Sequence, residues 1–286
     1  LSDHFYPNNW KKLLSQKRYL ILTSPKYISY YADLISPSRI YVIENKLSAF
    51  FTGLRPQTKQ FTSERIVIGL IGLMRFEKPL RMLVEFVKNN SSRFSINCYG
   101  DGPFKTLFSE SDSEYIRYFG PFKNPDDLQR IYSEIDLSFV VYDNSNYNVR
   151  VALPNKLYES AFFGVPLFVA EHTSLAEIVN EHDVGAAVSL ESQDDFEKPF
   201  NLLNSVKLAA YSSNCFLILT DDLLDNGSKI LQQIISRDVD PWSITSLWEK
   251  PWYYSKFVED LDLRGIPFVV GWRIWTNESL TKVWTI

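Results

Sequence analysis

The fold class is indicated most clearly by RIVIGLIGLMRFEKPLRMLVEFVKNNSSRFSINCYG, residues 65 to 100. An apolar run that ends at Gly72 is followed by an amphipathic segment and then by a second apolar run, which ends at Gly100. Short β-rich runs that alternate with helix-like segments are typical of βα units, which build a parallel sheet covered by helices on both faces. The stretch therefore predicts one βαβ unit of a doubly wound, Rossmann-type α/β domain.

The same alternation continues to residue 205 and occurs in a shorter form before residue 48. It predicts a division into four segments. These are the end of a preceding α/β domain (1–48), a polar linker (49–64), the main α/β domain (65–205) and a tryptophan-rich α/β segment (206–286). On this division most of one domain of a two-domain α/β protein is missing or rearranged.

The last segment restarts the alternation with apolar runs such as NCFLILTDD (214–222) and IPFVVGWRIW (266–275), which we expect to be strands. Six of the seven tryptophans lie in it: Trp242, Trp248, Trp252, Trp272, Trp275 and Trp284. The odd spacing of Trp272 and Trp275 sends their side chains to opposite faces of a strand. Two interpretations stay open, a central strand buried on both faces, or an exposed aromatic patch beside Arg273 that contacts a membrane or an acceptor.

Composition narrows the class of protein and its partners. The chain of 286 residues is 45% hydrophobic and 22% charged, which is typical of a globular protein. Its net charge is −4 and it has no long Lys/Arg block, so we expect no nucleic-acid partner. Cys98 and Cys215 lie far apart in apolar runs, which predicts buried free thiols in a reducing compartment. Because no apolar run approaches ~20 residues, we expect a cytoplasmic chain without a spanning helix.

Two strand ends carry residues suited to an anion. Arg75 and Lys78 follow Gly72 at the start of a helix, where free N–H groups already favour negative charge. In YGDGP (99–103), Gly102 indicates a tight turn and Asp101 is available as a cap. The alternatives are solvated surface cations and a plain turn.

The segment PNKLYESAFFG (154–164) predicts a helix that starts at Pro154 and ends before Gly164. Lys156 and Glu159 are three positions apart and therefore project from one face of this helix. A carboxylate there can accept both hydroxyls of a ribose while the ammonium group binds a phosphate. The alternative is a local surface ion pair that contributes a few tenths of a kcal/mol to stability.

Taken in order, the motifs GLMRFEK, YGDGP, YFGPF, LQRIYSEID, LPNKLYESAFFGVP and LAEIV resemble the donor-binding domain of group 1 glycosyltransferases of the GT-B fold. The resemblance spans residues 65 to 200, and the segment before residue 48 resembles the last units of that family's acceptor domain. It implies two facing Rossmann-like domains and an enzyme that moves a sugar from a nucleotide-diphosphate sugar to a glycan or lipid-linked acceptor in polysaccharide biosynthesis. It also implies contact with the inner face of a membrane.

The resemblance implies roles for individual residues as well. Arg75 and Lys78 match the basic pair at the diphosphate, and Glu159 matches the glutamate that binds the ribose. Because cations around the diphosphate stabilise the charge of the leaving group, neither a metal nor another cofactor is expected. No catalytic residue is assigned. Seven residues fall at substrate-binding motif positions: Gly72, Arg75, Lys78, Gly102, Lys156, Glu159 and Glu177.

One departure from the family pattern keeps a second function open. The glutamate that the family often has eight positions before the ribose ligand is replaced by Val151. A catalytically degenerate domain that binds a nucleotide sugar or a partner protein is therefore the alternative. A metal-dependent GT-A glycosyltransferase would need Asp260 and Asp262 as its metal ligands, but a charged face of an amphipathic helix explains that segment better.

Overall fold

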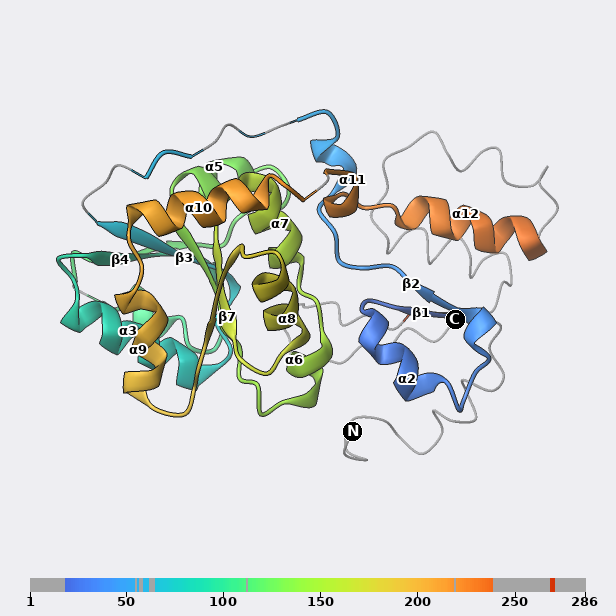
Figure 1. Ribbon diagram of the computed structural model, residues 1–286, viewed down its shortest axis with the longest axis horizontal. Coiled ribbons are helices and arrows are strands. Elements are labelled where there is room, and N and C mark those ends of the chain that lie inside the picture. The colour runs from blue at the N-terminus through green and yellow to red at the C-terminus, as the bar shows by residue number, and fades with distance from the viewer. Residues whose placement is uncertain are drawn as a thin grey trace. The chain divides into compact units, whose positions relative to one another are not determined.

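The computed structural model describes residues 19–238, apart from 55, 57, 58, 62–64, 112 and 219, together with the backbone of 268–270. Contacts between residues divide the chain into two compact units, Leu1–Glu44 with Asp225–Ile286, and Asn45–Leu224. In its described part, each unit is built on a parallel sheet of its own (Figure 1). The expected domain boundaries at residues 48, 64 and 205 stay predictions.

The larger unit alternates strands and helices along most of its length. After a short 3₁₀ turn, η3 (Ala49–Phe51), its elements are β3 (Ile66–Leu73), α3 (Glu77–Asn89), β4 (Phe94–Asp101), α4 (Thr106–Ser109), β5 (Ile116–Gly120), α5 (Leu128–Ser133), β6 (Leu137–Val140), α6 (Tyr147–Val151), α7 (Asn155–Phe163), β7 (Leu167–Ala170), α8 (Ser174–Glu181), β8 (Gly185–Val188), α9 (Gln193–Asn201), α10 (Ser205–Cys215) and α11 (Thr220–Leu223).

The six strands of this unit are all parallel and lie in the order β5-β4-β3-β6-β7-β8. Counted from β3, this is the order of the Rossmann fold, in which the chain starts at the centre and fills first one half of the sheet and then the other. The prediction of a doubly wound α/β domain is therefore confirmed. The reversal of direction falls between β3 and β6, which pair with each other.

Helices cover both faces of the sheet. Residues of α5, α7 and α8 pack with one set of strand side chains, and residues of α3 and α9 pack with the opposite set. Figure 1 shows α5 and α7 on one side of the sheet and α3 and α9 on the other. In β7, Leu167 and Val169 face the first core while Phe168 and Ala170 face the second. Strands buried on both faces explain the continuous apolar runs of the sequence.

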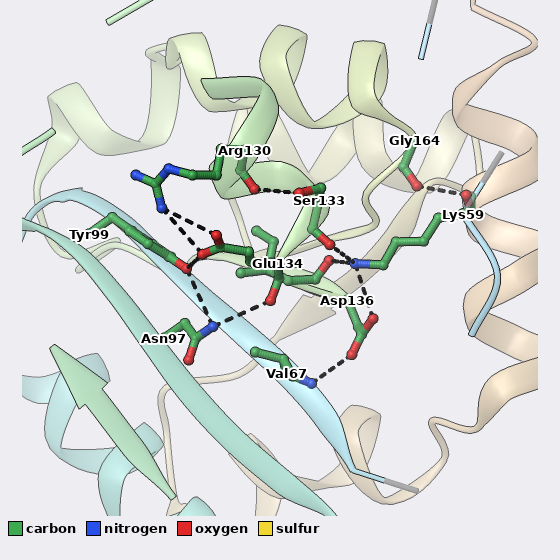
Figure 2. A network of polar contacts seen from close by, with 11 residues as sticks. Lys59, Val67, Asn97, Tyr99, Arg130, Ser133, Glu134, Asp136 and Gly164 are labelled. Atoms are coloured by element: carbon green, nitrogen blue, oxygen red, sulfur yellow. Dashed lines mark hydrogen bonds and ion pairs between the residues drawn. The ribbon is translucent and has the colours of Figure 1, made fainter. Parts of the chain in front are cut away.

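The segment expected to be a linker belongs to the larger unit and packs against other parts of it. Phe51 is 1% exposed and contacts the rings of Phe162 and Phe163 on α7. Lys59 forms an ion pair with Asp136, with 3.2 Å between its Nζ and Oδ1, and the other carboxylate oxygen accepts a hydrogen bond from the N–H of Val67. The contacts of Asp136 with Lys59 and Val67, at the amino ends of β6 and β3, are drawn in Figure 2.

The smaller unit holds the strand–helix–strand pattern expected near the start of the chain. Its described elements are β1 (Tyr19–Leu22), η1 (Pro25–Tyr27), α2 (Ile28–Tyr31), η2 (Pro37–Arg39), β2 (Ile40–Val42), α12 (Gly227–Asp238) and β9 (Phe268–Val270). β1 is central and pairs in parallel with β2 and with β9. A strand expected in the tail therefore forms, and it completes a sheet with the first described strand.

The expectation of a strand over residues 214 to 222 is wrong. Asn214 and Cys215 end α10, and the chain then continues to the short helix α11. The side chain of Asn204 caps α10 by accepting a hydrogen bond from the N–H of Lys207. Short apolar runs of buried helices and strands look alike in a sequence, so periodicity alone could not separate them.

Both cysteines are buried and free, as expected. Burial raises the pKa of Cys98 well above its ordinary value and raises the pKa of Cys215 to about 12. The tryptophans of the tail, Arg273, and the aspartates of the DLD segment lie outside the described residues.

Candidate functional site

The carboxyl ends of β3 and β6 frame the candidate site. β3 leads through Gly72 and Leu73 toward α3, on one face of the sheet, whereas β6 leads through Tyr142 toward α6 and α7, and α7 lies on the other face. Chains that leave neighbouring strands in opposite directions open a crevice at that edge, and open α/β sheets bind their ligands there. Gly72 has a φ of 108°, a left-handed conformation that favours glycine.

Glycines let the neighbouring strand end approach this loop. A Cβ on Gly100 would lie 1.9 Å from the carbonyl oxygen of Gly72, and a Cβ on Gly102 would lie 2.6 Å from that of Met74. Asp101 caps no helix here; its Oδ1 accepts a hydrogen bond from the N–H of Gly102 at 2.7 Å and pairs with Lys105. Gly102 therefore supports the loop that carries Arg75.

Lys156 and Glu159 form a buried ion pair on α7, with 2.6 Å between Nζ and Oε2. Lys156 is 5% exposed and Glu159 is 2% exposed, so the alternative of a solvated surface pair is wrong. The helix begins one residue later than expected, because Pro154 is its N-cap, and it ends as predicted at Gly164, which has a φ of 67°. A Cβ on Gly72 would lie 3.9 Å from Cε of Lys156, which places this lysine against the end of β3.

Three donors satisfy the carboxylate of Glu159. Asn155 donates to Oε1 at 2.5 Å, while Lys156 and Tyr132 donate to Oε2 at 2.6 Å and 3.0 Å. Tyr132 comes from α5 and is 1% exposed. Burial raises its pKa well above the ordinary value, and the charge of Glu159 raises it further. The hydroxyl is therefore protonated at neutral pH and acts as a fixed donor to Glu159.

Two aromatic rings lie near the guanidinium of Arg75. Its Cζ lies 4.5 Å from the ring centroid of Phe76 and 6.0 Å from that of Tyr142. The two rings lie 5.3 Å apart, and cations over aromatic faces are attracted by the ring quadrupole. Burial raises the pKa of Tyr142 to about 12, Arg75 opposes this shift and Glu159 adds to it. Tyr142 is therefore within electrostatic reach of both the arginine and the glutamate.

The other predicted residues lie on exposed helix starts. Lys78 is in the first turn of α3, and Glu177 is in the first turn of α8, the helix that follows β7. The structure thus brings Gly72, Lys156 and Glu159 together. The assignment of substrate contacts to all seven predicted residues stays a prediction.

Sequence reasoning missed four residues of this arrangement. Asn155 lies four positions before Glu159 and could have been found by helical spacing. Tyr142 directly follows the buried strand run and could have been found by the strand-end rule. Phe76 directly follows Arg75, but its contact with the guanidinium depends on the backbone of the loop and has no signal in the sequence. Tyr132 is 27 residues from Glu159 and no local pattern joins the two.

The arrangement has the chemistry of a site for an anion that carries hydroxyl groups. Removal of two charges from water costs several kcal/mol per ion, and their mutual attraction regains this only with excellent geometry. A buried Lys–Glu pair is therefore weak evidence for stability, and its place at the carboxyl end of a strand is one where open α/β sheets bind ligands. Here the pair adjoins the end of β3, and a second cation, Arg75, lies two residues beyond that end.

A separate cavity lies at the opposite edge of the sheet. It has a volume of about 220 Å³ and is lined by residues that include Phe61, Ile66, Arg93 and Asn204. Ile66 begins β3, so this cavity adjoins the amino end of the strand whose carboxyl end carries Gly72. An experiment can therefore distinguish a ligand in this cavity from a ligand at the candidate site.

The fold is the GT-B glycosyltransferase fold that the sequence motifs implied. No family model matches the chain. Among solved structures, sucrose-phosphate synthase from Thermosynechococcus elongatus superposes with a TM-score of 0.60 and 14% identity, covering 80% of this chain and 61% of the synthase. The likeness at this identity concerns the fold.

Two further solved structures have a similar fold. A glycosyltransferase from Rickettsia africae has a TM-score of 0.54 and 16% identity, with 80% of this chain and 67% of that protein covered. Anabaena HepE, solved in complex with UDP and glucose, has a TM-score of 0.55 and 15% identity, with 77% and 62% covered.

One curated protein is related in sequence. The succinoglycan biosynthesis protein ExoL of Rhizobium meliloti is 26% identical over 181 residues, which is 59% of this chain and 45% of ExoL. The chain thus spans less than half the length of this relative. In the described part of the chain, no helix is long and apolar enough to cross a bilayer.

Proposed function

We propose that the chain is part of a glycosyltransferase that takes a sugar from a nucleotide-diphosphate sugar and transfers it to a glycan or lipid-linked acceptor. The observation that supports this most is the buried Lys156–Glu159 pair at the carboxyl end of β3. The pair lies at the switch point of a Rossmann-type sheet, where such folds hold nucleotides. The name of ExoL favours a role in polysaccharide synthesis, and UDP in HepE favours a nucleotide donor.

In this proposal the diphosphate is bound by Arg75 and Lys78, with Lys156 as a third cation. The helix α3 begins at Glu77, so its free N–H groups point toward the same region. As the sugar bond breaks, negative charge grows on the leaving diphosphate, and fixed cations stabilise that charge. Through these three side chains the protein would supply the charge stabilisation that other enzymes obtain from a metal ion.

Glu159 is the proposed ribose ligand. Its carboxylate can accept about four hydrogen bonds, and three donors of the protein already occupy it. A diphosphate that attracts Lys156 would leave one oxygen site on Glu159 for a ribose hydroxyl, in addition to the site that is already open. Binding of the phosphate and binding of the ribose are thus expected to favour each other.

A second function has one observation in its favour. Val151, at the end of α6, occupies the position where the family often has a glutamate, so no carboxylate stands there. A domain that binds a nucleotide sugar without transferring it is consistent with this. Release of the nucleotide from donor in the presence of acceptor lipid or glycan would support the enzyme, whereas binding without release would support the degenerate domain. For the glycosyltransferase, but not for the degenerate domain, we also propose a peripheral contact with a membrane surface.

The diphosphate assignment predicts a loss of affinity in two variants. Arg75→Ala and Lys78→Ala should each weaken binding of the cognate nucleoside diphosphate by about 1 to 3 kcal/mol, the range for hydrogen bonds to charged groups. Isothermal titration calorimetry measures this after a thermal-shift screen of UDP, GDP, dTDP and CDP. Arg81→Ala is the matched control, because Arg81 lies on the same helix, is exposed and is paired with Glu77 at 2.7 Å. Unchanged affinity in both folded variants would sink the assignment.

A further inference from the structure

Tyr132 links α5 to the carboxylate of Glu159 on α7. Its hydroxyl donates to Oε2 at 3.0 Å, and its ring stacks on Phe163 with 4.9 Å between centroids and 12° between planes. The residue is 1% exposed, so the ring has little freedom to move. Both the orientation of the hydroxyl and the place of the ring are therefore set by packing.

We propose that Tyr132 is a positioning residue that holds the Glu159 carboxylate in the orientation that recognises the ribose hydroxyls of the nucleotide. This inference rests on the proposed function and adds to it a residue that the sequence motifs do not assign. Tyr132 acts through Glu159 and makes no contact with the nucleotide itself.

The other two donors to Glu159 are less suited to this task. Asn155 and Lys156 are on α7 itself, in its first turn, and Lys156 is a cation that an anionic diphosphate attracts. When Lys156 turns toward the diphosphate, Oε2 keeps one donor, the hydroxyl of Tyr132. This hydroxyl is neutral, so the incoming anion does not draw it away from Glu159.

A second tyrosine provides a matched control. Tyr99 has the same two contacts, a hydroxyl that donates to Oε2 of Glu134 and a ring stacked on Phe119 at 4.6 Å and 8° (Figure 2). It is also 1% exposed. Glu134 directly follows α5 and its backbone carbonyl accepts a hydrogen bond from Asn97, so this pair belongs to the network shown in Figure 2 and not to the proposed ribose site.

The test compares a ribonucleoside diphosphate with its 2′-deoxy form. The ribonucleotide is the one of UDP, GDP and CDP that binds the wild-type protein, and calorimetry gives both affinities. Tyr132→Phe keeps the stacked ring and removes one hydrogen bond. It should lower the affinity for the ribonucleotide by about 5- to 10-fold and the affinity for the 2′-deoxy form by less. Tyr99→Phe should leave both affinities unchanged.

Glu159→Gln separates this inference from the function on which it rests. A larger loss for the ribonucleotide than for the 2′-deoxy form supports Glu159 as the ribose ligand. In the Glu159→Gln background, Tyr132→Phe should cause no further loss if it acts through Glu159. If Glu159→Gln lowers the affinity for the ribonucleotide more than that for the 2′-deoxy form and Tyr132→Phe does not, the positioning role alone is wrong. If the wild type binds none of the three nucleotides, or Glu159→Gln weakens both forms equally, the proposed ribose site is wrong and the inference falls with it.

Discussion

Lys156 and Glu159 show at the scale of the residue how far spacing alone can predict. Their separation of three positions correctly placed both side chains on one face of a helix and in contact. Their burial could not be predicted from the helix, because it depends on Tyr132 from α5 and on the approach of β3 at Gly72. A local pattern thus identified the pair, while the tertiary contacts decided that it is not a surface ion pair.

The burial of this pair predicts an asymmetry in stability. Lys156→Met alone leaves a carboxylate buried without its counter-ion and should lower the free energy of unfolding by about 3 to 5 kcal/mol. The double variant Lys156→Met with Glu159→Gln removes both charges and should regain most of that loss. Urea unfolding measures both values. A single variant as stable as the double one would contradict the buried-pair account.

At the scale of the element, α7 was predicted almost completely and residues 214 to 222 were not. α7 has a proline at its start and a glycine at its end, and both signals act through the local backbone. Residues 214 to 222 contain an apolar run without such signals. Their first two residues are the last residues of α10, whose N-cap, Asn204, lies ten residues before Asn214. Local start and stop residues therefore predict element bounds better than apolar runs do.

The end of α7 predicts the effect of one substitution. Gly164 has a φ of 67°, and a Cβ there would lie 2.4 Å from the ring of Phe216. Gly164→Ala should therefore destabilise the protein by more than the roughly 1 kcal/mol of backbone strain alone. Gly53→Ala is the matched control, since Gly53 has a φ of 80° and no atom within 4 Å of the added carbon. Equal losses in thermal or urea unfolding for the two variants would show that the packing against Phe216 is unimportant.

At the scale of the whole molecule, the sequence predicted the class of fold but not all strand pairings. Alternating strands and helices lead to a parallel doubly wound sheet by general rules of connection, and the larger unit has that sheet. The parallel pairing of β9 with β1 joins residues 268–270 to residues 19–21. The pairing of strands so far apart in the sequence depends on which edge of the sheet is open in the folded chain. Local periodicity therefore cannot predict it.

Hydrogen exchange with mass spectrometry, with and without the nucleoside diphosphate that binds best, tests whether a nucleotide-sugar donor binds at the carboxyl ends of β3 and β6. We expect slower exchange in residues 72–78 and 154–160 of the wild-type protein when the nucleotide is present, because ligand contacts suppress local opening of the backbone. Protection confined to residues 203–208, at the cavity of the opposite edge, or no protection at saturating nucleotide, would contradict it.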